Sequence, residues 1–191
     1  MLNQNIVLIG FRGAGKSTFG RAIAKQLVNI NTTKFRSNTM QVETIRDVLN
    51  WTVSFHENLK DCLKHCSEQN KDERAQMTLH YLSDHEASLE RIMKGFVNTA
   101  DKKALNTWCY DYIEKHPFIE HGHCDSPFKE LDMTHIMEKT INHHEQIIEL
   151  YTHLYSRVDI DSAKELLDTI KDVEENEIKR MVQAVNRFSD M

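Results

Sequence analysis

The sequence predicts an all-α protein: a four-helix bundle from about residue 41 to residue 191, preceded by a short strand, phosphate-loop and helix segment. Apolar residues recur at alternating three- and four-residue steps through four long stretches, as on helices that face a core. The connections between these stretches run short, long, short. Residues 1–40 contain six Lys and Arg and no Asp or Glu, so the rest must carry −11 to give the overall −5. We therefore expect two units, residues 1–40 (phosphate-loop-like segment and linker) and residues 41–191 (bundle).

The overall composition limits the classes of partner. Apolar residues make up 40% and charged residues 28% of the chain, as in globular proteins. The longest aliphatic run, Ile6–Ile9, is far too short for a membrane span, and there is no apolar core of a secretory signal. A net charge of −5 argues against a nucleic-acid partner, which would favour a basic face. We expect a cytoplasmic protein without a membrane or nucleic-acid partner.

The N-terminal segment carries a phosphate-loop motif. A short buried-strand pattern, residues 5–9, leads into GFRGAGKST, and a helical stretch follows to about Leu27. This is GxxxxGK[ST] in its required setting, after a strand and before a helix. Its glycines let the backbone wrap a phosphate, Lys16 supplies a positive charge and Ser17 can hold Mg²⁺. The candidate nucleotide ligands are Gly10, Gly13, Gly15, Lys16, Ser17 and Thr18.

Residues 5–27 resemble the opening of shikimate kinases, which implies ATP and Mg²⁺ as ligands and a kinase activity. The resemblance ends there. The acidic Asp-x-Asp element of that family has no counterpart, because residues 28–40 contain no acid. The family's glycine triplet and arginine pair are absent, and no later run of four aliphatic residues offers a further parallel strand. Two interpretations therefore stand: a nucleotide-binding kinase, or a remnant or fused segment.

The kinase interpretation makes a direct prediction. If the phosphate loop binds ATP, then millimolar ATP with Mg²⁺ should raise the thermal unfolding temperature of the wild-type protein. Lys16→Ala should abolish that shift, because it removes the positive charge that faces the phosphates. Differential scanning fluorimetry measures both, and an unchanged unfolding temperature in the wild type would exclude the kinase.

The bundle helices are predicted at about residues 41–67, 71–97, 131–157 and 161–188. Each is about 27 residues long, or about 40 Å at 1.5 Å per residue. Connections of about three residues make the first two helices, and the last two, antiparallel hairpins. More than thirty residues separate the second helix from the third, enough to cross the bundle, and a short helix is expected near residues 102–115.

This arrangement resembles the ferritin-like superfamily, which includes rubrerythrin and ferritin. The resemblance implies a homo-oligomer and a di-iron-like site inside the bundle. In that family two helices each supply a Glu, and the other two each supply a Glu-x-x-His pair.

Ionisable residues interrupt each apolar stripe near its middle. Such groups are costly to bury unless they are paired or bind a metal. Pairing the helices about their tight turns brings these positions to similar heights, so they can converge in one core. The interrupting residues are His56, Glu86, His144, Glu174 and Glu177, and three belong to His-Glu dipeptides, at 56–57, 85–86 and 144–145. A one-residue error in register would exchange a His for a Glu, so both members stay candidates.

Carrying over the ferritin-like pattern leaves two gaps. Glu57 or His56 matches the first helix and Glu145 or His144 the third. Leu89 and Glu177, however, stand where the two histidines of Glu-x-x-His are expected. The predicted metal ligands are His56, Glu57, Glu86, His144, Glu145, Glu174 and Glu177, a set compatible with Fe, Mn or Zn.

Two alternatives remain beside this metal site. One is a metal-free structural or interaction bundle, in which His–Glu pairs fix the helix register. The other is a zinc site formed by Cys62, His65 and Cys66 with residues 121–124 of the crossover.

Overall fold

The computed structural model describes residues 43–109 and 126–189, with side chains to residue 184. The chain divides into two units, Met1–Thr39 and Met40–Met191, and every described residue belongs to the second. The predicted N-terminal strand and helix, and all six candidate nucleotide ligands, lie outside the described residues.

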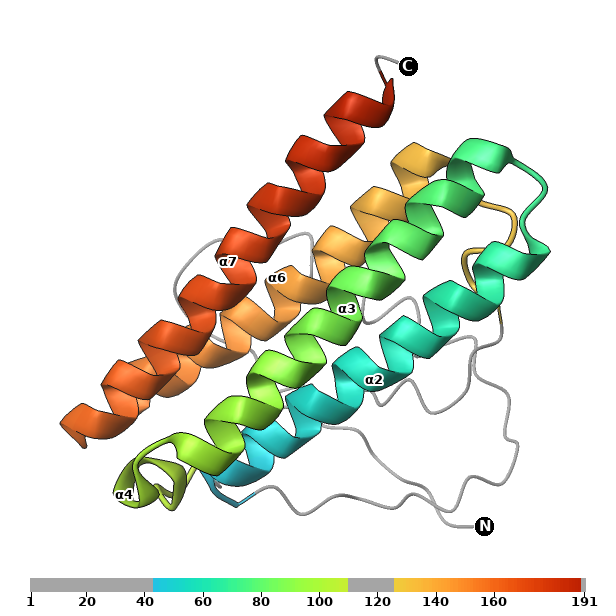
Figure 1. Ribbon diagram of the computed structural model, residues 1–191. Helices are drawn as coiled ribbons and strands as arrows, with labels where there is room; N and C mark the ends of the chain where they lie inside the picture. Colours follow the sequence, from blue (N-terminus) through green and yellow to red (C-terminus); the bar gives the residue numbers. More distant parts are fainter. Residues whose placement is uncertain (1–42, 110–125, 190–191) are drawn as a thin grey trace, which may run out of the picture. The chain divides into compact units, whose positions relative to one another are not determined.

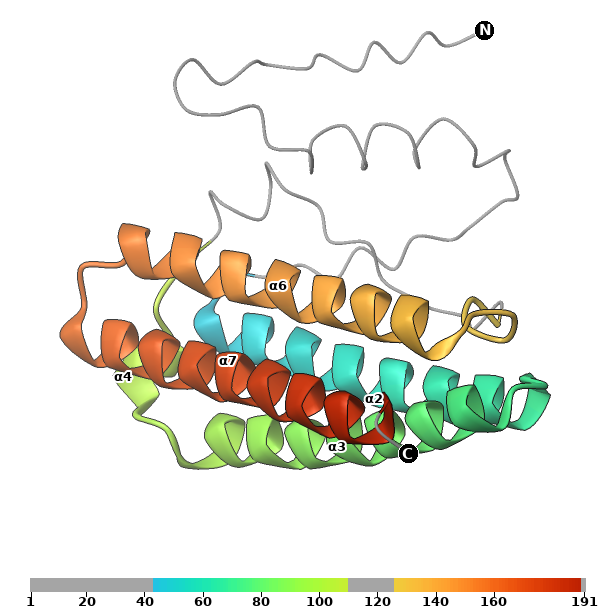
Figure 2. The same cartoon turned by 90° about the horizontal axis from the view of Figure 1, so that it is seen from above.

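The described residues form an all-α four-helix bundle, as predicted. The long helices are α2 (Ile45–Gln69), α3 (Glu73–Thr99), α6 (Met133–Arg157) and α7 (Asp161–Ser189), and α4 (Lys102–Leu105) is short. Residues 70–72 join α2 to α3 and residues 158–160 join α6 to α7, whereas residues 100–132 separate the two pairs. Figures 1 and 2 show α2 beside α3 and α6 beside α7. The short, long, short order of connections is confirmed.

Capping residues fix the first residue of α2, α3 and α6. These helices begin two to four residues later than the spacing of apolar residues predicts. Thr44 accepts a hydrogen bond from the backbone of Asp47, whose carboxylate accepts one from the backbone of Thr44, so α2 starts with a capping box. Asp72 caps α3 and Asp132 caps α6 in the same sense, each accepting from backbone N–H groups of the first turn. The spacing of apolar residues alone does not reveal these polar N-cap residues, so it does not give the exact first residue of a helix.

The short helix ends earlier than predicted. Helix α4 stops at Leu105, because the chain after it pairs with the start of α2. The Ile45 N–H donates to the Thr107 carbonyl at 3.0 Å, and the Cys109 N–H donates to the Glu43 carbonyl at 2.8 Å. These bonds need extended backbone, which excludes a helix through residue 109; residues 110–115 lie outside the described residues.

The apolar core consists of two clusters, one at each end of the bundle. In α2 the first cluster takes residues 45–53 and the second residues 59–66. The other long helices divide in the same way, so that each leaves a gap between its two apolar stretches. The site described below fills this gap. Among the described helices, none combines the length and apolarity needed to cross a membrane.

Candidate metal centre

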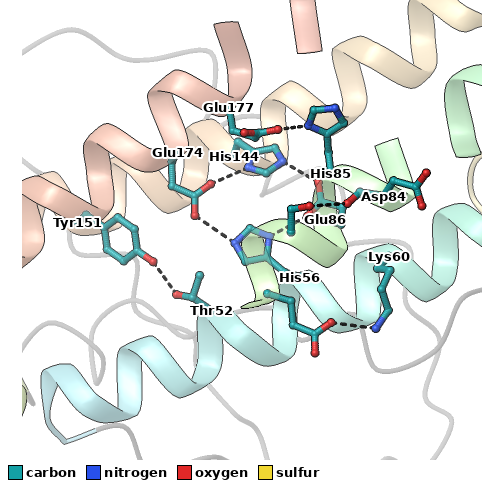
Figure 3. Close-up of polar contacts among 12 residues, drawn as sticks. Thr52, His56, Lys60, Asp84, His85, Glu86, His144, Tyr151, Glu174 and Glu177 are labelled. Carbon is teal, nitrogen blue, oxygen red and sulfur yellow. Dashed lines mark hydrogen bonds and ion pairs between the residues drawn. The ribbon is translucent and has the colours of Figure 1, made fainter. Parts of the chain in front are cut away.

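Each long helix contributes one fully buried ionisable side chain to the layer between the two apolar clusters. These side chains are His56 from α2, Glu86 from α3, His144 from α6 and Glu174 from α7, and each is 0% exposed. Figure 3 shows the four pointing toward one another. Four chain segments that lie up to 118 residues apart in sequence therefore meet at one level.

The four side chains form a closed ring of contacts, here called the His–Glu ring (His56, Glu86, His144 and Glu174). His56 Nδ1 lies 2.7 Å from one Glu86 oxygen, and His144 Nε2 lies 2.9 Å from the other. On the far side, His56 Nε2 and His144 Nδ1 lie 3.1 and 2.8 Å from the two Glu174 oxygens. Each carboxylate oxygen thus faces one ring nitrogen. The imidazoles stack with centroids 5.6 Å apart.

Mutual attraction inside the ring overcomes the effect of burial on every member. Burial alone would lower the pKa of the imidazoles, but the charges and hydrogen bonds of Glu174 and Glu86 raise it to about 9 for His56 and about 10 for His144. Burial alone would raise the pKa of the carboxyls, but His144 and His56 lower it to about 2 for Glu86 and also lower it for Glu174. Without an ion, the stable form has two imidazolium and two carboxylate groups.

That form is electrically neutral and fully hydrogen bonded. With both carboxyls ionised, as their lowered pKa values require, all four contacts are hydrogen bonds when both nitrogens of each imidazole carry a proton. Two positive and two negative charges then cancel. In the described part of the chain no buried side-chain nitrogen or oxygen lacks a partner. A complete network of this kind makes the burial of four ionisable groups tolerable.

The same atoms are suited to hold a metal ion. One donor atom from each of His56, Glu86 and His144 lies within 4.8 Å of the other two. Two imidazoles and one carboxylate form a donor set that transition metals accept. The ring nitrogens that point away from Glu86 face Glu174. A metal-bound histidine generally donates its second N–H to such an outer carboxylate, which orients the imidazole.

A buried tyrosine extends the polar layer along α2. The Tyr151 hydroxyl donates to Thr52 Oγ1 at 2.9 Å. The Thr52 hydroxyl donates in turn to the Val48 carbonyl at 3.1 Å. Burial and the negative charge of Glu174 raise the pKa of Tyr151 well above its ordinary value. Tyr151 therefore remains a neutral donor, held one helical turn from the level of His56.

Glu177, the fifth buried ionisable residue predicted from the stripes, does not join the ring. It forms an ion pair with His85 across α3 and α7 (Figure 3). Arg180 Nη1 lies 3.6 Å from the second Glu177 oxygen. The His85 ring lies 4.2 Å from the ring of Tyr81. From the sequence, His85 is a candidate only as the neighbour of Glu86 in a His-Glu dipeptide; α3 turns Glu86 into the core, and His85 is half-buried and faces α7.

In each of the three His-Glu dipeptides, the structure turns one member into the core. His56 and His144 point into the core while Glu57 and Glu145 are exposed, because consecutive helical residues are turned about 100° from each other. Glu57 and Glu145 therefore lie away from the predicted metal site. The alternative zinc site also loses a ligand: Cys62 is disulfide-bonded and so offers no thiolate, and residues 121–124 lie outside the described residues.

Comparison with known proteins supports the architecture. No protein-family model matches the chain, and neither does any curated protein. A solved structure from Thermotoga maritima, named as a ferritin-like diiron-carboxylate protein, matches with a TM-score of 0.51 at 17% identity, over 73% of this chain and 93% of that one. The fold is ferritin-like. At this identity the likeness concerns the ferritin-like bundle and carries no ligand across.

The side chains present do not fit the two-iron centre of ferritin-like carboxylate proteins. That centre draws four Glu and two His from the helices. In this bundle the inward side chains at the site are two His and two Glu, and Leu89, 0% exposed, occupies one expected histidine position. Glu177 occupies the other and is paired with His85. The donor set therefore departs from the two-iron pattern on all four helices.

Proposed function

We propose that this ferritin-like bundle binds a transition-metal ion in the layer between its two apolar clusters. The observation that carries the proposal is the convergence of His56, Glu86 and His144, with donor atoms within 4.8 Å and no exposure to solvent. Mixed imidazole and carboxylate ligands are compatible with Fe, Mn and Zn. A solved structure of the same fold is named as a diiron-carboxylate protein, which agrees with a metal-binding role for such a bundle.

The residues of the ring divide into two roles. His56 and His144 supply nitrogen ligands and Glu86 supplies oxygen. Glu174 accepts hydrogen bonds from the nitrogens that remain, and so fixes the orientation of both imidazoles. The apolar clusters on either side keep bulk water away from these groups. A bound ion would supply Lewis-acid or, for Fe and Mn, one-electron chemistry.

Metal analysis of purified protein tests the proposal. Wild-type protein purified without chelator, or stripped and then reloaded, should contain bound metal, as measured by plasma mass spectrometry. His144→Ala and Glu86→Ala should lose it, because each removes one of three ligands. His135→Ala is the matched control: His135 lies on the same helix as His144, is exposed, and pairs with Asp132. Wild-type protein that retains no Fe, Mn or Zn after reloading would refute the proposal.

A metal-free bundle is the second candidate, and the closed ring itself favours it. Two imidazolium and two carboxylate groups already satisfy one another without an ion. In that case the ring fixes how the helices align, as polar core residues do in some coiled coils. The metal analysis separates the two candidates, since a purely structural ring would leave wild-type protein and both alanine variants equally free of metal.

A further inference from the structure

We propose, on the basis of the metal binding inferred above, that the centre holds a single divalent ion per chain rather than a pair. His56, His144 and Glu86 are its ligands, and Glu174 is a positioning residue that accepts hydrogen bonds from the outer nitrogens of both imidazoles. Three features of the ring lead to this stoichiometry: the number of nitrogens, the balance of charge, and the absence of spare donors among the described residues around it.

The nitrogens of the ring suffice for one ion. Each imidazole has two nitrogens, one facing Glu86 and one facing Glu174. A neutral imidazole binds a metal through one nitrogen and keeps a proton on the other. An ion on the Glu86 side therefore leaves two N–H groups, and these are placed to donate to the two Glu174 oxygens. A second ion on the Glu174 side would need both imidazoles to lose that proton as well.

The charge of the ring also matches one divalent ion. Glu86 and Glu174 together carry two negative charges, and both side chains are 0% exposed. One divalent cation with two neutral imidazoles makes the layer neutral. Two divalent cations with both imidazoles still neutral would leave two uncompensated positive charges between apolar clusters, where unpaired charge is strongly unfavourable. A centre with four carboxylates, as in the two-iron proteins, balances two divalent ions by the same count.

The surroundings of the ring offer no second set of ligands in the described part of the chain. Leu89 is apolar and buried where a second ion would need a histidine. Glu57 and Glu145 face solvent. Glu177 is the other buried carboxylate on α7, and it is held by His85 and Arg180. Across residues 43–109 and 126–184, the ring supplies the one group of three or more close metal donors.

Counting bound ions tests the stoichiometry directly. Full-length protein is stripped with EDTA, reloaded with excess Mn²⁺, and freed of unbound ion by gel filtration. Plasma mass spectrometry against amino-acid analysis should then give one Mn²⁺ per chain. Electron paramagnetic resonance should show the signal of an isolated Mn²⁺ ion and not that of a magnetically coupled pair.

Glu177→Gln is the discriminating variant. If the centre holds one ion, this variant keeps one Mn²⁺ per chain, because Glu177 is not a ligand. Two ions per chain in the wild type, or a coupled-pair signal, would overturn the single-ion centre, most directly if Glu177→Gln brings the count down to one. A count of zero, repeated with Fe²⁺ and Zn²⁺, would instead refute the metal binding on which the stoichiometry rests. Circular dichroism verifies that the variant keeps its helices.

Discussion

Metal-free Glu86→Ala protein is expected to unfold with a free energy about 3–5 kcal/mol below that of the wild type. Glu86 is 0% exposed and accepts hydrogen bonds from His56 Nδ1 and His144 Nε2 at 2.7 and 2.9 Å. Its removal leaves two buried N–H donors without acceptors and one positive charge without a counterpart. Urea denaturation in the presence of EDTA, followed by circular dichroism, measures the change separately from any effect on metal binding.

Glu90→Ala is the matched control for this loss. Glu90 lies one turn further along α3 and forms ion pairs with Lys60 at 2.9 Å and Lys94 at 2.5 Å, near the surface. Pairs of this kind contribute less than about 1 kcal/mol to the free energy of unfolding, because solvent screens them. If Glu86→Ala costs no more than Glu90→Ala, the His–Glu ring does not stabilise the metal-free bundle.

The pH dependence of unfolding should be the second large effect. The pKa values of His56 and His144 rise from 6.5 to about 9 and about 10 in the folded protein, so their contribution is complete below pH 6.5 and is lost as pH rises through 9 to 10. The pKa of Glu86 falls from 4.5 to about 2, so its contribution is complete above pH 4.5 and is lost toward pH 2. Metal-free protein should therefore be most stable between pH 4.5 and 6.5.

The loss above pH 6.5 is the unusual part of this profile. Each imidazole should lower the free energy of unfolding by up to about 1.4 kcal/mol per pH unit until its folded pKa is reached. A variant with leucine at all four ring positions is the control. It should show a flatter profile, and its stability near pH 6 should equal or exceed that of the wild type, as when buried ion pairs are replaced by apolar residues. Equal stability of metal-free wild type at pH 6 and pH 9 would contradict the charged form of the ring.

The heights of the ring residues could be predicted from the sequence because they follow from helix geometry alone. Connections of about three residues force antiparallel pairing, and counting outward from each turn sets His144 near Glu174 and His56 near Glu86. Periodicity also placed the inward His56 and His144 on the apolar stripes. It could not exclude Glu57 and Glu145, because a stripe drifts as it runs along a helix with 3.6 residues per turn.

The pairing pattern within the layer could not be predicted. Which carboxylate oxygen meets which ring nitrogen depends on the rotation of each helix about its axis, and the sequence does not encode that rotation locally. The pairing of Glu177 with His85 has the same origin: α3 turns Glu86 inward, and its neighbour then reaches α7 at the edge of the core. The early end of α4 depends on a backbone hydrogen bond between Ile45 and Thr107. These residues are far apart in the sequence, so the residues near α4 alone could not predict it.

The division of the core into two apolar clusters has a consequence for how the helices align. Contacts between aliphatic side chains are not directional, so burial of apolar surface alone would distinguish only weakly between this alignment and one in which a helix is shifted by a full turn. The His–Glu ring between the clusters opposes such a shift. A displaced helix would move its imidazole or carboxylate into an apolar cluster and would leave the other ring residues without their hydrogen-bond partners. The central polar layer therefore fixes the axial register of the four helices relative to one another.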